Sequence, residues 1–274
     1  MSKYVLIHGH FYQPPRENPW NGKIPLQKSA LPFHDWNERI HKECYEPNSR
    51  SRILDADGRI LSLVNNYSYL SFNIGPTLMD WIRSENPQTY LRIKEADHIS
   101  TKKLNGHGNG IAQVYNHLIM PLASQRDQIT QIEWGIADFE FHFHRKPDAM
   151  WLGETAINQE VAVNLMNAGI KYVLLAPQQA AKVRPFDGEW SSVQADSVDT
   201  SKAYRVFDKD SKGNVISKRY LDVLFYDGPT STAVSFEGVL KNSQHFYDKI
   251  KSRFKKATDV PEIVTIATDG ESYG

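Results

Sequence analysis

The sequence predicts an α/β fold with a parallel sheet at its centre, and three observations support that prediction. Short runs of β-branched and aromatic residues recur along the 274 residues, separated by stretches with helical spacing. The runs are apolar at successive positions, as strands covered by helices on both faces require. Neither a fixed-length repeat nor a low-complexity tract interrupts the alternation. Strands that alternate with helices form βαβ units, so we expect a single domain, residues 1–274, with a barrel-like core.

Seven of these runs are the predicted strands, and the most regular segments between them are the predicted helices. The strands cover residues 4–8, 69–74, 110–116, 149–152, 172–176, 222–226 and 263–267. Helical spacing is clearest in residues 157–168, which end at Gly169, a residue typical of a helix C-terminus. Residues 243–256 form a second predicted helix, just before the last strand.

Two segments depart from the alternation and are expected to be insertions. Residues 11–60 are rich in Pro, Asn, Arg and Trp and have little periodicity. A loop of that length is usually functional, so we expect it to cover the mouth of the barrel. Residues 184–220 are predicted to form turns and short strands, with residues 211–214 (SKGN) as a hairpin tip.

The composition argues against several classes of partner. Lys plus Arg equals Asp plus Glu, 32 each, so no basic surface for nucleic acid or an anionic membrane is expected. No apolar stretch approaches the roughly 18 residues needed to span a bilayer, and the start of the sequence does not resemble a signal peptide. The single cysteine, Cys44, rules out an internal disulfide. We therefore expect a cytoplasmic protein without a nucleic-acid or membrane partner.

Polar and titratable side chains follow five of the seven predicted strands. They are His8, His10, Asn73, His117, Glu154, Asp269 and Glu271. In a parallel α/β barrel the C-terminal ends of the strands meet at one edge, where active sites lie. Each residue also has an ordinary structural explanation: the histidines as hydrogen-bonded scaffold, Glu154 as a charge at a helix N-terminus, Asp269 as a helix cap. All of these explanations would have to hold at the same edge, which favours a functional site.

Four motifs in this chain resemble those of glycoside hydrolase family 57. HGHFYQPP, GHGNGIAQVYNH, MWLGETA and TDGESYG occur in the order and approximate spacing of the first four motifs of that family, and the resemblance covers residues 4–274. It implies an incomplete (β/α)7 barrel, TIM-like, followed by a helical bundle that helps to close the active site. The sequence given stops just after the fourth motif, so we expect the bundle to be missing and this chain alone to be weakly active or inactive.

The resemblance also implies roles for particular residues. Glu154 matches the family's nucleophile and Asp269 its general acid/base, which together make a retaining hydrolase or transglycosylase of α-glucans. His8 and His10 match the motif that lines the reactive subsite, Trp151 precedes the nucleophile, and His117 ends the second motif. Oligo- or polysaccharide is the implied partner, with no cofactor and no metal.

The chain departs from the family pattern at three places. The first motif carries an extra Phe-Tyr before Gln13, and Gly153 stands where a proline is common. The second motif often contains a glutamate, and no acid lies between Gly106 and His117. These differences leave the two carboxylates in place and bear on substrate specificity.

Aromatic residues outside the motifs are candidate platforms for sugar rings. Trp20 and Trp36 lie in the segment 11–60, and we expect at least one of them to reach the pocket. Tyr12 and Trp190 are further candidates.

Two other functions are compatible with the same residues. His8, His10, His117 and Asp269 could bind a divalent metal, as in zinc-dependent α-mannosidases or polysaccharide deacetylases, although no HxxxH or HExxH spacing is present. A non-catalytic glycan-binding fragment is the third possibility.

Overall fold

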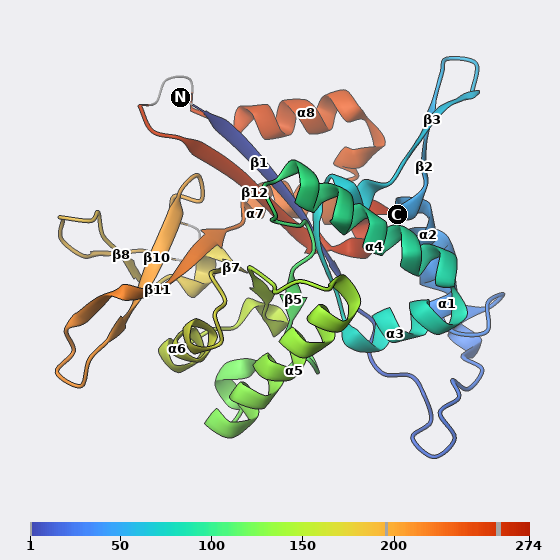
Figure 1. Ribbon diagram of the computed structural model, residues 1–274. Helices are drawn as coiled ribbons and strands as arrows, with labels where there is room; N and C mark the ends of the chain where they lie inside the picture. Colours follow the sequence, from blue (N-terminus) through green and yellow to red (C-terminus); the bar gives the residue numbers. More distant parts are fainter. Residues whose placement is uncertain (1, 195–196, 256–258) are drawn as a thin grey trace.

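The computed structural model describes residues 2–194, 197–255 and 259–274, and its centre is a set of parallel strands flanked by helices (Figure 1). The strands are β1 (Lys3–Phe11), β2 (Ser51–Leu54), β3 (Ile60–Val64), β4 (Ser71–Ile74), β5 (Ala112–Gln113), β6 (Met150–Trp151), β7 (Tyr172–Leu175), β8 (Lys182–Val183), β9 (Ser191–Ser192), β10 (Ala203–Lys209), β11 (Val215–Phe225) and β12 (Glu262–Asp269). The helices are α1 (Trp36–Ile40), α2 (Glu46–Ser49), α3 (Pro76–Glu85), α4 (Pro87–Lys103), α5 (Gln125–Phe143), α6 (Gln159–Asn167), α7 (Gly228–Phe236) and α8 (Ser243–Ser252).

Each of the seven predicted strands corresponds to a strand of the structure, and these strands are parallel neighbours in one series. β1 pairs with β12 on one side and with β4 on the other. A bridge from Phe72 to Gly110 leads to β5, which pairs with β6. A bridge from Ala149 to Tyr172 leads on to β7, which pairs with β11. Because all of these pairings are parallel, the C-terminal ends of the strands lie at one edge.

The two ends of this series approach each other without forming a ladder. The amide of Asp227, just after β11, donates to the carbonyl of Thr265 in β12 at 2.7 Å. Ile263 in β12 donates to Ser201, just before β10, at 3.0 Å. In the described part of the chain no ladder joins β11 to β12, so the structure shows no closed barrel.

The core lies between the strands and the helices on either side. β12 is buried along nearly its whole length, as expected of a parallel strand covered on both faces. One hydrophobic cluster joins β6, β7 and β11 to α5 and α6, with Phe139, Leu165 and Leu221 among its members. A second joins Phe11 and Phe72 to α3 and α4. Figure 1 shows these helix groups on different sides of the central β1–β12 pair.

Local sequence explains where the main helices begin and end. The side chain of Ser124 caps α5 by accepting from the amide of Asp127, and His144 ends that helix in the left-handed conformation. Asn158 caps α6 in the same way, and Gly169, with φ of +83°, follows its end as predicted. α8 ends at Ser252, and residue 256, the last of the predicted helix, lies outside the described residues. Among the described residues no helix combines the length and apolarity that crossing a bilayer requires.

The two predicted insertions contain more regular structure than expected. Residues 11–60 are not one long loop: a π-helix, His41–Tyr45, joins α1 to α2, and β2 and β3 form a hairpin. The buried side chains of Cys44 and Tyr45 anchor this helical segment in the core, which periodicity could not reveal. In the second insertion β10 and β11 form an antiparallel hairpin with residues 211–214 in its tip, as predicted.

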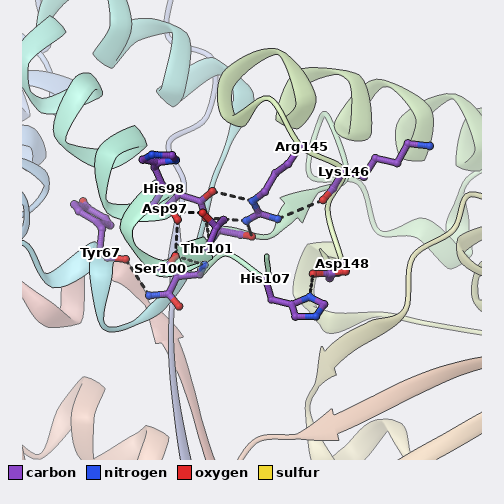
Figure 2. Close-up of polar contacts among 11 residues, drawn as sticks. Tyr67, Asp97, His98, Ser100, Thr101, His107, Arg145, Lys146 and Asp148 are labelled. Atoms are coloured by element: carbon purple, nitrogen blue, oxygen red, sulfur yellow. Dashed lines mark hydrogen bonds and ion pairs between the residues drawn. The ribbon is translucent and has the colours of Figure 1, made fainter. Parts of the chain in front are cut away.

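The glycine-rich half of the second motif directly precedes β5, so it lies at the N-terminal edge of the strands. Figure 2 shows the polar contacts of Asp97, Arg145, His107 and Asp148 in this region, which are structural. Asp97 accepts two hydrogen bonds from Arg145 and one from the amide of Gly110, while Arg145 donates to the Gly110 carbonyl. A Cβ on Gly108 would lie 2.3 Å from both partners of this buried ion pair. His107 bonds Asp148 at 2.7 Å in the same region. The motif therefore begins at the N-terminal edge of the strands. Its other end, with His117, follows β5 and lies at the C-terminal edge.

Candidate active site

The structure places the predicted site residues on strands and turns that end at the same edge. His8 and His10 lie in β1, and His117 follows β5. Glu154 lies in a 3-10 turn, Gly153–Thr155, directly after β6, and Asp269 is the last residue of β12.

Five aromatic rings stack on one another at this edge of the strands. His8 and His10 point to the same side of β1, as residues two apart do, and their ring centroids lie 5.0 and 4.8 Å from the indole of Trp151. The ring of His117 lies 4.9 Å from His10. Tyr12 stacks on His117 at 4.3 Å and extends the stack outward. We call these five side chains the histidine stack.

A chain of hydrogen bonds fixes the orientation of the three imidazoles. His8 bonds Ser71 through Nδ1 at 2.9 Å and Asn73 through Nε2 at 3.0 Å. The Asn73 amide lies 2.9 Å from His10 Nδ1, and His10 Nε2 lies 3.0 Å from His117 Nε2. In one consistent set of donors each imidazole carries one proton, with His8 donating to Asn73 and His10 donating to His117.

Burial keeps these histidines neutral near pH 7. It lowers the pKa of His8 to about 4, opposed by the hydrogen bond that His8 donates to Asn73. It lowers the pKa of His10 to about 3, with help from His117. Burial also lowers the pKa of His117, while the charges of Glu154 and Asp269 oppose the change. The stack therefore offers uncharged hydrogen-bonding rings next to two carboxyl groups.

Asp269 lies at the same edge as Glu154, and the two carboxyls interact electrostatically. The residue is exposed at the end of β12, yet desolvation by surrounding atoms raises its pKa, the charge of Glu154 raises the pKa further, and His117 partly offsets both. Glu154 is exposed at the same edge. Asp269 therefore holds its proton more tightly than a free aspartate does, and the charge of Glu154 causes part of this rise in pKa.

The turn that carries Glu154 needs glycine before it. A Cβ on Gly153 would lie 2.6 Å from the Leu118 carbonyl and 2.8 Å from the His117 carbonyl. Glu154, Thr155 and His117 themselves adopt positive φ angles of 53°, 53° and 55°, which are sparsely populated for residues with a Cβ. Close packing of the two backbones thus holds Glu154 and His117 together at some cost in backbone strain.

A buried network on the other side supports the turn that carries Asp269. The Tyr45 hydroxyl donates to Glu271 at 2.6 Å, and Gln13 donates to Tyr45 at 3.0 Å and to Glu271 at 3.3 Å. Arg16 in turn donates to Gln13 at 2.6 Å. Burial raises the pKa of Glu271, partly offset by the Tyr45 hydrogen bond. The segment 11–49 is therefore tied directly to the residues after Asp269.

Sequence reasoning missed several members of this site. Asn73 was visible at a strand end but without a role, and Gln113, whose oxygen accepts from Asn73 at 2.7 Å, was not singled out. Within the described residues, the buried nitrogens Gln113 Nε2 and Trp151 Nε1 have no hydrogen-bond partner. Buried donors of this kind suit a substrate hydroxyl or a water molecule.

The tryptophans of the segment 11–60 lie away from the histidine stack. Trp20 is 93% exposed on a loop. Trp36 starts α1, donates to Ser29 and lies beneath the guanidinium of Arg39 at 4.8 Å. Trp190 carries Arg184 over its ring in the second insertion. Sugar contacts by these three residues stay a prediction, whereas Tyr12 does contact the stack.

The imidazoles point at one another rather than at a common vacant point. His10 and His117 join their Nε2 atoms at 3.0 Å, and both ring nitrogens of His8 bond Ser71 and Asn73. The described residues contain no group of three or more His, Cys, Asp or Glu side chains arranged to hold a metal ion.

Solved structures of known proteins share the fold of this chain. The chain is similar to the structure of a 4-α-glucanotransferase from Thermococcus litoralis, with 14% identity and a TM-score of 0.61, over 99% of this chain and 33% of that one. It is similar to an exo-type maltose-forming amylase from a Pyrococcus species, with 15% identity and a TM-score of 0.66, over 99% and 43% of the two chains. A probable polysaccharide deacetylase from Pseudomonas aeruginosa has 9% identity and a TM-score of 0.54, over 98% and 78%.

Identities of this size show a shared α/β fold, and the chain spans less than half the length of the first two structures. A search of curated proteins gives no match. The sequence model of glycosyl hydrolase family 57, in contrast, matches residues 8–274. Because that match covers nearly the whole length, the chain belongs to glycosyl hydrolase family 57.

Proposed function

We propose that the chain is the catalytic part of a retaining glycoside hydrolase or transglycosylase that acts on α-glucans. The observation that carries this proposal is the placement of two carboxyls directly after separate parallel strands at one edge, where burial and the charge of Glu154 raise the pKa of Asp269. A protonated carboxyl beside an ionised one is what retaining catalysis requires. The glucanotransferase and amylase that share the fold favour an α-glucan as the substrate.

In the proposed mechanism the two carboxyls act in sequence. Glu154 attacks the anomeric carbon to form a glycosyl-enzyme, while Asp269 protonates the leaving oxygen. Asp269 then removes a proton from water, or from a sugar hydroxyl in transfer, as the second step releases Glu154. The neutral imidazoles of His10 and His117, next to these groups, are suited to hydrogen-bond sugar hydroxyls without adding charge.

The finer features of the fold belong to the same proposal. We infer that the seven parallel strands form an incomplete (β/α)7 barrel within one catalytic domain, supported by their order and by the bonds between Asp227 and Thr265 and between Ile263 and Ser201. A cytoplasmic location and action in carbohydrate metabolism, without cofactor or metal, are predictions of the same kind.

Variants of the two carboxyls test the function. In a longer form of the chain that turns over an aryl α-maltoside, Glu154→Gln should lower kcat by at least about a thousandfold, because the missing bond forms only along the reaction coordinate. Asp269→Asn should spare the first step for substrates with good leaving groups and slow release of the sugar. Glu160→Gln, an exposed carboxylate on α6, is the matched control and should keep the parent rate.

A wild-type rate for Glu154→Gln would contradict the proposal. The metal-dependent alternative would then be examined by metal analysis of the purified chain. Absence of turnover together with intact sugar binding, in this chain and in a longer form of it, would favour the non-catalytic alternative.

A further inference from the structure

A polar cavity of about 830 Å³ lies between α3 and residues 17–42. Figure 1 shows α1 and α3 on the same side of the molecule, to the right of the central strands. The volume of the cavity falls in the range of about 300–1,000 Å³ found for ligand pockets.

The cavity is continuous with the loops that build the active site. Tyr115 and Asn116 line its inner end and directly precede His117. Pro76 and Thr77 line it from the start of α3, and the preceding Gly75 abuts the Tyr12 ring of the histidine stack. Chain segments that hold the stack therefore also form the inner wall of the cavity.

The charges of the wall favour a neutral ligand. Acidic and basic side chains both line the wall; Asp80 forms an ion pair with Arg83 at 3.1 Å, and His34 forms a hydrogen bond with Asp35 at 3.0 Å. Mixed charge of this kind does not form the one-signed field that concentrates an ionic ligand. A wall rich in carboxylates, amides and hydroxyls is equally unsuited to an apolar ligand.

Aromatic surface adds the other feature that a sugar ligand needs. Trp81 and Tyr115 line the cavity, and both are half-buried. Tyr115 is held edge-on against Trp134 at 5.6 Å, and Trp81 against His41 at 5.8 Å. Fixed rings beside hydrogen-bonding side chains suit the apolar faces and the hydroxyls of glucose units.

We propose that this cavity binds additional glucose units of a glucan chain whose reacting bond lies at Glu154 and Asp269. The inference rests on the proposed function, and it assigns chain-length preference to α3 and the segment 17–42.

Calorimetric titration of the Glu154→Gln chain with maltotriose and with maltoheptaose tests the inference. Maltoheptaose should bind about tenfold tighter or more, because its extra units reach the cavity. Asp80→Asn and Tyr115→Ala should each weaken maltoheptaose binding by about three- to tenfold and leave maltotriose unchanged. Asp57→Asn, at the exposed tip of the β2–β3 hairpin, is the matched control and should change neither affinity.

Three outcomes would overturn the inference. Equal affinity for the two sugars would reject the cavity as a subsite while leaving the proposed function standing, as would maltoheptaose affinity that survives both substitutions. If neither maltotriose nor maltoheptaose binds, the proposed function is overturned as well. Asp80 is exposed on α3, so its variant keeps the test valid if Tyr115→Ala does not fold.

Discussion

His8 and His10 are buried histidines that remain neutral, and this links the stability of the fold to pH. Their folded-state pKa values, about 4 and about 3, lie below the value of about 6.5 in an unfolded chain. Between these values the unfolded chain binds protons that the native chain does not. The contribution of these two histidines to the free energy of unfolding is therefore fully present above about pH 6.5. It should be lost as the pH falls from about 6.5 towards 4.

Replacing His8 should flatten this pH dependence. His8→Leu should lower stability at pH 7, because Ser71 and Asn73 lose a buried partner. Between pH 6.5 and 4, however, the variant should lose roughly 3 kcal/mol less of its free energy of unfolding than the parent does. The measurement is the urea midpoint across this range. His245→Leu, an exposed position on α8, should keep the parent slope. An unchanged slope in His8→Leu would contradict the proposed burial of a neutral imidazole.

Individual site residues were predictable where they end a strand, and not elsewhere. His8, His10, His117, Glu154 and Asp269 follow apolar runs, so the parallel sheet alone brings them to one edge. Tyr45 reaches Glu271 across 226 residues from a segment without periodicity. Only the folded packing of the π-helix brings them together, so no local pattern could have identified that contact.

Among the structural elements, the turn at Gly153–Thr155 is the one on which Glu154 depends. It follows a two-residue strand and packs against the turn at His117, with the backbones in direct contact at Gly153. The contacting atoms are carbonyl oxygens, which cannot move away as a flexible side chain could.

Gly153→Ala should therefore damage both the turn and catalysis. The added methyl group should cost about 1–3 kcal/mol of stability and separate Glu154 from His117. Thermal unfolding and kcat on an aryl α-maltoside measure the two effects. Gly228→Ala is the matched control, since a Cβ there meets nothing within 4 Å. Equal stability and rate in the two variants would show that Gly153 is not required.

For the whole molecule, the sequence predicted the seven parallel strands but not all of the helices and hairpins around them. The seven strands are apolar because both of their faces are buried, so each strand can be recognised from its own short apolar run. The β2–β3 hairpin exposes Ile53, Leu61 and Leu63, so its strands lack the alternation of a half-buried sheet. Pairing across a barrel seam depends on long-range contacts, and here the ends of the series meet through single hydrogen bonds.

The central claim is that Glu154 forms a covalent bond to the sugar. The most direct test is to incubate the chain with a 5-fluoro-α-glycosyl fluoride, whose ring fluorine slows release of the glycosyl-enzyme, and to map the product by peptide mass spectrometry. The account predicts one added sugar on the peptide that contains Glu154, and none in Glu154→Gln. Hydrolysis of the reagent with the sugar attached to a different residue would contradict it.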